Sequence, residues 1–268
     1  MSVVNALEDQ LRAKRDAGRK LLVPYVTGGL AGWIDAIRAA AANGADAIEV
    51  GIPFSDPVMD GPVIQQASQQ ALDDGATPVS ILEALRHVDV DVPLIVMCYY
   101  NTVHHAGHER FAAQLRDAGV SGAIVPDLPL EESGPWCAAA DAHGIASVML
   151  AAPTAPDDRL PRVCARARGF VYSVGLLGVT GERAALASTA THLAARLKKV
   201  TDVPVIVGVG VSNAQQAVEA CRVADGVVQG AAVVRRLMEG GPDLVGAYVA
   251  EVRSALDSMT TPIDVSAL

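Results

Sequence analysis

Residues 20–52 read KLLVPYVTGGLAGWIDAIRAAAANGADAIEVGI, and they show the structural unit from which the fold can be predicted. It contains an apolar, β-branched run at 20–27, an alanine-rich segment, and a second apolar run at 46–52. Short apolar runs predict buried strands, and the alanine-rich segment between them predicts a helix that covers them. Because a helix joins the two strands, they are expected to lie parallel in one sheet.

The same strand-helix unit is repeated along the rest of the chain, with a spacing of about 30 residues. Six further strand candidates lie at 93–99, 121–126, 146–150, 169–174, 204–208 and 225–229. A doubly wound open sheet also alternates strands and helices, but eight units with glycine turns at the strand ends favour a closed barrel. We therefore predict an α/β fold: a single-domain (β/α)8 TIM barrel over residues 1–268. An extra N-terminal helix is expected over about 3–17, and a C-terminal tail over about 259–268 is a candidate for disorder.

Composition agrees with a barrel and limits the classes of function. Hydrophobic residues make up 51% of the chain and aromatic residues only 4%, as expected for parallel strands and their covering helices. The net charge of −9 disfavours non-specific binding to nucleic acid or to an anionic membrane, because both require a basic surface. The chain lacks the roughly 18 consecutive apolar residues of a membrane span, and its N-terminus does not resemble a signal peptide. We expect a cytoplasmic protein.

Residue types that hold metals or cofactors are scarce. The four cysteines form no CxxC pair, which disfavours a zinc site or a redox motif. His104, His105 and His108 form one cluster, but no carboxylate or cysteine completes a tetrahedral set, so we interpret them as an exposed polar loop. None of the four lysines falls at the end of a predicted strand, which disfavours a Schiff-base aldolase. No metal or organic cofactor is expected.

Two carboxylates mark the second predicted strand and the loop that follows it. Glu49 lies in an otherwise apolar strand, where a carboxylate either faces the barrel mouth or has its pKa raised by desolvation. A raised pKa suits proton exchange near neutrality. Asp60 lies in the proline-rich loop PFSDPVMDGP (53–62), from which it can reach back towards Glu49. The alternatives are that a nearby donor satisfies Glu49 and that Asp60 caps the next helix.

Glycine-bearing turns follow the last three predicted strands. They are Gly178-Val179-Thr180-Gly181, Gly208-Val209-Gly210-Val211-Ser212 and Gln229-Gly230-Ala231-Ala232. In TIM barrels the loops after strands seven and eight commonly bind phosphate through backbone N–H groups at a helix N-terminus. Glycine allows the backbone to approach the anion closely. The three turns together predict a phosphate pocket.

These motifs resemble those of the tryptophan synthase α family, from about Leu7 to about Leu256. The matching segments are Pro24-Tyr25-Val26-Thr27, Gly44-Ala45-Asp46, Pro53-Phe54-Ser55-Asp56-Pro57, Asp60-Gly61-Pro62, Tyr100-Asn101, Pro126-Asp127-Leu128-Pro129, Glu131-Glu132, Tyr172, the first two glycine turns and Asp225-Gly226. The segment from Glu49 through residues 53–62 is highly specific, whereas the glycine turns alone are not.

The resemblance implies a retro-aldol cleavage of indole-3-glycerol phosphate to indole and glyceraldehyde 3-phosphate, without a cofactor. It implies that Glu49 is the acid-base group. It implies that Asp60 stabilises or removes the proton of the indole N–H, where positive charge develops. The substrate contacts that it implies come from Tyr25, Tyr172, Thr180, Gly181, Gly210, Gly230 and Ala231.

The resemblance also implies a partner, a pyridoxal-phosphate-dependent β subunit in an α2β2 complex. The implied docking residues are Pro53, Asp56, Asn101, Asp127 and Pro129. Their alternative role is to cap helices and shape turns. The chain departs from the family pattern in the first loop, at residues 28–32, at Ala231, where a serine is common, and at residues 173–177, which include Leu176.

Three other functions remain open at this point. A stand-alone indole-3-glycerol phosphate lyase would use the same residues and release free indole to another pathway. A sugar-phosphate isomerase would share the barrel and the phosphate pocket but would lack the Asp56-to-Asp60 loop. A non-catalytic chain that only regulates a β subunit is disfavoured by the presence of both Glu49 and Asp60.

Overall fold

Eight parallel strands close into a barrel in which each strand pairs with the next along the chain and β8 pairs with β1. The computed structural model describes residues 6–175, 188–208 and 210–259. The strands are β1 (Leu21–Thr27), β2 (Ile48–Gly51), β3 (Leu94–Met97), β4 (Val120–Ile124), β5 (Ala146–Ala151), β6 (Val171–Val174), β7 (Val205–Gly208) and β8 (Gly226–Gln229). The predicted barrel and all eight predicted strands are confirmed, with strand boundaries shifted by at most two residues.

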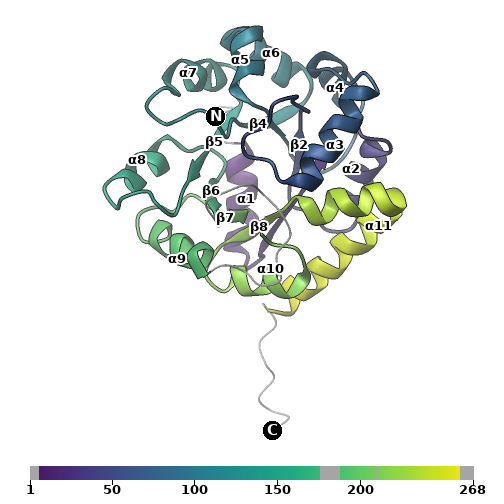
Figure 1. Cartoon of the computed structure of the whole chain (residues 1–268). Helices are drawn as coiled ribbons and strands as arrows, with labels where there is room; N and C mark the ends of the chain where they lie inside the picture. Colours follow the sequence, from purple (N-terminus) through teal and green to yellow (C-terminus); the bar gives the residue numbers. More distant parts are fainter. Residues whose placement is uncertain (1–5, 176–187, 209, 260–268) are drawn as a thin grey trace.

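Helices surround the barrel on all sides (Figure 1). They are α2 (Trp33–Ala42), α3 (Pro62–Asp73), α4 (Pro78–Leu85), α5 (Tyr100–Ala106), α6 (His108–Asp117), α7 (Gly134–Ala142), α8 (Arg159–Arg166), α9 (Ser188–Leu197), α10 (Ala214–Cys221) and α11 (Ala231–Ser258). Two helices, not one, follow each of β2 and β3, and α11 bends at Gly241 before Pro242. Within the described residues, no helix is long and apolar enough to cross a membrane.

The predicted N-terminal helix is confirmed as α1 (Ala6–Asp16), which lies behind the strands in Figure 1. Its buried Leu7 and Leu11 join the apolar cluster inside the barrel. At Gly122 and Gly169 a Cβ atom would lie 2.8 Å and 2.7 Å from the Leu7 side chain, so glycine makes room for the helix. Because α1 fills one end of the barrel, the active site is expected at the other, the carboxyl ends of the strands.

Two predicted segments extend beyond the described residues: the part of the predicted N-terminal helix before Ala6, and the predicted C-terminal tail after Met259. Residues 176–187, which include Thr180 and Gly181, lie outside them as well. The altered first loop, residues 28–32, is described. It turns against the α3–α4 connection, where a Cβ atom at Gly28 would lie 3.1 Å from the Ile81 side chain, and none of its residues lines the pocket described below.

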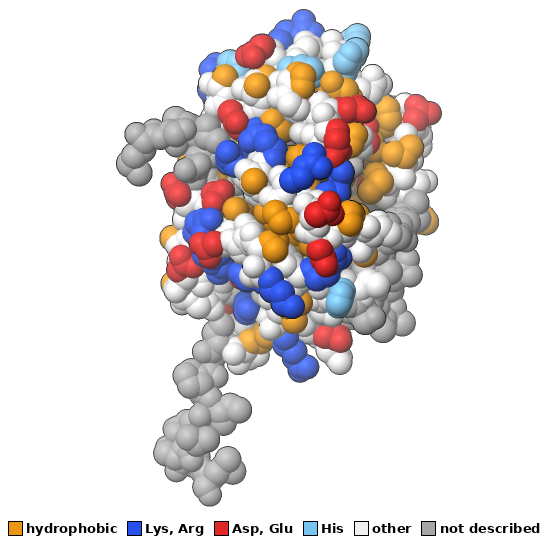
Figure 2. Space-filling view, turned by 90° about the vertical axis from the view of Figure 1, so that its left-hand side faces the viewer, with side chains coloured by type: hydrophobic (Ala, Val, Ile, Leu, Met, Phe, Trp, Pro, Cys, Tyr) orange, Lys and Arg blue, Asp and Glu red, His pale blue; other side chains and the backbone are white. Residues whose placement is uncertain are grey.

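Charges of both signs alternate on the face over α7 and α8 (Figure 2). The pair between Arg159 and Glu131, at 2.8 Å, is one example. Because the basic side chains on this face are interspersed with acidic ones, it does not offer the continuous basic surface that nucleic acid binding requires.

Candidate active site

A pocket opens at the carboxyl ends of the strands and brings together most of the residues singled out in the sequence. It is lined by Tyr25, Glu49, Met59, Asp60, Ile64, Met97, Ile124, Pro126, Leu150, Tyr172, Val174, Gly210, Val211, Ser212, Val228, Gly230 and Ala231. The side chains are mainly apolar, with a carboxylate pair and two tyrosines among them. Pockets of this composition, with a few polar groups in an apolar lining, are typical of small-molecule sites.

Glu49 lies deep in this pocket, on β2, directly beside Tyr25 of β1 in the parallel register. Its side chain is only 1% exposed, and among the described residues its Oε2 atom has no hydrogen-bond partner. Burial, and secondarily the charge of Asp60, raises the pKa of Glu49 to about 8. Glu49 therefore holds its proton at neutral pH, as the sequence-based argument about a carboxylate in an apolar strand predicts.

Asp60 lies in a different environment, because its carboxylate has a donor. The hydroxyl group of Tyr99 donates a hydrogen bond of 3.0 Å to its Oδ2 atom. Burial raises the pKa of Asp60, and the hydrogen bond from Tyr99 acts in the opposite direction. The alternative that Asp60 caps the next helix is wrong, since the N-cap residue of α3 is Gly61.

Two glycines make room for the two tyrosines of the pocket. A Cβ atom at Gly51 would overlap the hydroxyl group of Tyr25, and one at Gly208 would overlap the ring of Tyr172. Gly51 ends β2 and Gly208 ends β7, so each aromatic ring lies over the end of a neighbouring strand. The glycines at these strand ends thus shape the wall of the pocket as well as its turns.

The other end of the pocket is formed by backbone. Gly230 is the N-cap residue of α11, Ala231 is its first residue, and both line the pocket together with Gly210 and Ser212. The first N–H groups of a helix have no partners within the helix, and the helix dipole favours an anion there. Gly210 has a positive φ of 91°, which favours glycine at this position. The arrangement can bind a phosphate group.

The five predicted docking residues lie at the same end of the barrel, four of them in loops and Asn101 in the first turn of α5, but not all are accessible. Asp56, Asn101, Asp127 and Pro129 are exposed, whereas Pro53 is buried. Asp127 also accepts a hydrogen bond of 2.8 Å from the backbone N–H of Tyr100, at the start of α5. For Asp127, helix capping is therefore one role that the structure shows directly.

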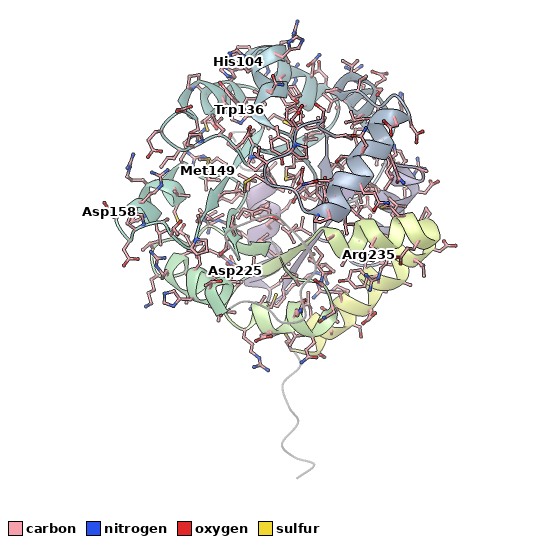
Figure 3. All side chains as sticks on the ribbon, viewed as in Figure 1. His104, Trp136, Met149, Asp158, Asp225 and Arg235 are labelled. Atoms are coloured by element: carbon pink, nitrogen blue, oxygen red, sulfur yellow. The ribbon has the colours of Figure 1, made fainter. Side chains whose placement is uncertain are left out.

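The histidine cluster does not form the exposed loop that we expected. His104 and His105 belong to α5 and His108 begins α6, because this segment forms two short helices after β3. In Figure 3 the side chain of His104 lies at the outer edge of the molecule, away from the barrel centre. The described residues contain no group of three or more histidine, cysteine or acidic side chains that could hold a metal ion.

Sequence reasoning missed Tyr99 and Met59 as residues of the site, and it included Ser212 only as part of the glycine turn after β7. Tyr99 directly precedes the Tyr100-Asn101 pair that the family resemblance includes, and Met59 directly precedes Asp60. Ser212 is the last residue of the glycine turn after β7, and its position at a strand end was the available signal.

The fold and the site define a TIM-barrel enzyme with a buried carboxylate pair beside a cluster of backbone N–H groups at a helix N-terminus. The sequence profile described as "Tryptophan synthase alpha chain" matches residues 11–259. The chain belongs to the tryptophan synthase alpha chain family, and as a member it is a carbon-carbon lyase of tryptophan biosynthesis.

Similar proteins cover nearly the whole chain. The tryptophan synthase alpha chain of Streptomyces coelicolor is 44% identical over 248 residues, which is 91% of this chain and 92% of the relative. That of Halorhodospira halophila is 41% identical, covering 96% and 98%. Among solved structures, a chain of Mycobacterium tuberculosis tryptophan synthase superposes with a TM-score of 0.87 at 35% identity, covering 94% of this chain and 98% of that chain.

Proposed function

We propose that the chain cleaves indole-3-glycerol phosphate into indole and glyceraldehyde 3-phosphate by a retro-aldol reaction in this pocket. The observation that carries the proposal is the contrast between two carboxylates in one pocket. Glu49 is buried with a pKa of about 8, whereas Asp60 accepts a hydrogen bond from Tyr99. Two carboxylates whose environments separate their pKa values are suited to act as acid and as anion in one reaction.

In the proposed reaction, Glu49 first donates its proton to C3 of the indole ring, which produces an indolenine cation. The carboxylate of Asp60 stabilises the positive charge at the ring N–H. Glu49, now ionised, removes the proton from the hydroxyl group on the carbon attached to C3. The bond between this carbon and C3 breaks, its electron pair returns to the ring, and the hydroxyl oxygen becomes the aldehyde oxygen of glyceraldehyde 3-phosphate. Protons and electrons balance without a cofactor.

We infer that the substrate lies with its indole ring against Tyr25 and its phosphate at the N-terminus of α11. Tyr25 and Tyr172 line the pocket near the carboxylates, and Gly210, Gly230 and Ala231 line it at the backbone end. Thr180 and Gly181 are proposed to complete the contacts on the basis of the family motif. Ala231 supplies a backbone N–H but no hydroxyl donor.

We propose that the chain acts as one domain, in the cytoplasm, in an α2β2 complex with a pyridoxal-phosphate-dependent β subunit. Asp56, Asn101, Asp127 and Pro129 support this because they are exposed at the end of the barrel where the pocket opens. The buried Pro53 would shape its loop without touching the partner. A docked β subunit would exclude water from the pocket and receive indole directly.

The test is indole release from indole-3-glycerol phosphate by the full chain, with and without the β subunit of the same organism. The isolated chain should be slow and the complex fast. Glu49→Gln should lower turnover by on the order of 10²–10⁴ or more, because an amide retains the shape but cannot exchange a proton. Near-normal turnover in Glu49→Gln would contradict the proposed mechanism.

The same assay decides between this function and a stand-alone lyase. If the isolated chain releases indole at about 1 s⁻¹ or faster, and the β subunit changes neither this rate nor the elution volume of the chain, the stand-alone lyase replaces the proposed subunit.

A further inference from the structure

Tyr99 connects the loop that carries Asp60 to the end of β3. Its phenol oxygen accepts a hydrogen bond of 3.0 Å from the backbone N–H of Met59 and donates one of 3.0 Å to Oδ2 of Asp60. Because the Met59 N–H occupies an acceptor position of the phenol oxygen, the single phenol proton is directed at Asp60. One hydroxyl group thus holds both the backbone and the carboxylate of this part of the loop.

The side chain of Tyr99 is itself held firmly. It is only 3% exposed, and its ring stacks on that of Phe54 with a centroid distance of 5.0 Å. The next residue begins α5, where the N–H of Tyr100 is bound by Asp127 at 2.8 Å. Because the ring of Tyr99 is held by these contacts, its hydroxyl group stays in one position and can fix the orientation of the Asp60 carboxylate.

The surroundings of Asp60 show why this hydrogen bond matters. The titratable groups that face Asp60 come from four strands or strand ends: Tyr25, Glu49, Tyr99 and Tyr172. Among the described residues, Tyr99 is the one that donates a hydrogen bond to its carboxylate. A hydrogen bond to a carboxylate favours the charged form, whereas burial opposes it. Oε2 of Glu49 has no such donor among these residues, so the two carboxylates of the pocket are unequal.

We propose that Tyr99 is a positioning residue for Asp60, whose carboxylate it holds in the orientation and the ionised state that indole cleavage requires. This role rests on the proposed function, since it assigns a task to Tyr99 in that reaction. It also explains how one member of the carboxylate pair carries the charge while Glu49 carries the proton.

The first test compares Tyr99→Phe with the native chain in complex with the β subunit. Phenylalanine retains the ring and its stacking but removes both hydrogen bonds. We expect kcat to fall roughly 10–100-fold, as for the loss of a hydrogen bond to a charged group, with KM changed less than about threefold. The acidic limb of the kcat–pH profile should move to higher pH, because Asp60 then ionises less readily. Tyr100→Phe is the matched control, since its hydroxyl group contacts His108 at 3.0 Å and does not line the pocket.

The second test does not depend on activity. The side-chain carboxyl carbon of Asp60 is labelled with ¹³C, and its NMR signal is assigned by the absence of that signal in Asp60→Asn. The chemical shift of this carbon is then followed against pH in the native chain and in Tyr99→Phe. The pKa of Asp60 should be higher in Tyr99→Phe. If Tyr99→Phe fails to fold, Phe54→Leu keeps both hydrogen-bonding groups but removes the ring that holds the phenol, and the pKa of Asp60 should rise in it too.

An unchanged Asp60 titration, or a kcat within twofold of native with the same acidic limb, would overturn the positioning role. A native complex that releases no indole would instead refute the proposed function, and the titration would still decide the role of Tyr99.

Discussion

Replacing Glu49 by glutamine removes the acid-base group. The free energy of unfolding of the variant, compared with that of the native chain, should nevertheless increase as the pH rises. The pKa of Glu49 is raised from 4.5 to about 8 in the folded chain. A raised pKa means that the folded state retains a proton that the unfolded state loses between these two values. The contribution of Glu49 to stability is therefore intact below about pH 4.5 and is lost progressively as the pH rises through about 8. Glutamine does not titrate and escapes this loss.

The size of the effect follows from the same pKa. Each pKa unit corresponds to about 1.4 kcal/mol, so the whole difference is at most about 5 kcal/mol for this fully buried group. Between about pH 5 and about pH 9 the linkage relation gives about 4 kcal/mol of that total. Local relaxation and water entry reduce such values, so we expect the stability of Glu49→Gln relative to the native chain to rise by roughly 2–4 kcal/mol over this range.

The measurement is urea unfolding of the native chain and of Glu49→Gln at about pH 5, 7 and 9. The amide in the variant adds a constant offset that is independent of pH, so only the change with pH is compared. Glu251→Gln is the control, because Glu251 lies exposed on α11 and its replacement should give no such change. A free-energy difference between native and Glu49→Gln that stays constant from pH 5 to pH 9 would refute a buried, protonated Glu49.

Three further predictions concern the pocket. Gly208→Ala should lower kcat/KM by about tenfold or more, because a Cβ atom there overlaps the ring of Tyr172. Gly134→Ala is the control, because a Cβ atom at that position meets nothing within 4 Å, and equal kcat/KM values in the two variants would show that the Tyr172 ring moves freely. Inorganic phosphate should compete with indole-3-glycerol phosphate in steady-state kinetics, since the backbone N–H groups can bind a phosphate that is not attached to the rest of the substrate. A non-competitive pattern would mean that phosphate binds outside this pocket. Ala231→Ser should tighten substrate binding by roughly 0.5–1.5 kcal/mol, the value of one added hydrogen bond, measured as Kd with the inactive Glu49→Gln chain; unchanged or weaker binding would mean that the site is adapted to alanine.

Much of the fold was predictable because its signal is local. Each strand is a short apolar run bounded by turn residues, so all eight could be located from neighbouring residues alone. The histidine segment was misread because a polar run of a few residues suits a loop as well as a short helix, and here α5 and α6 form. The pairs of helices after β2 and β3 were also missed, because a helix-like segment between two strands does not show from its residues alone whether it forms one helix or two.

The candidate site was partly predictable. Glu49 and Asp60 stood out because a carboxylate in or beside an apolar strand is unusual, and Gly210 and Gly230 because they follow strands at the end where TIM barrels bind ligands. Tyr99 did not stand out, since a tyrosine after an apolar strand is also an ordinary core residue.

The sequence alone was enough to predict the order of strands and helices and the closed barrel, and to indicate the end of the barrel where the site was sought. Hydrophobic periodicity and strand-end position are properties of neighbouring residues. The difference between the two carboxylates became visible only in the three-dimensional structure, where Glu49 is the one without a hydrogen-bond donor at Oε2 among the described residues and Asp60 accepts a hydrogen bond from Tyr99. Tyr99 and Asp60 are 39 residues apart in the chain and meet only because β2 and β3 are adjacent in the barrel. The pKa of Glu49 depends on burial by residues from several strands, and desolvation of this kind is set by the whole surroundings of a group and not by its sequence neighbours.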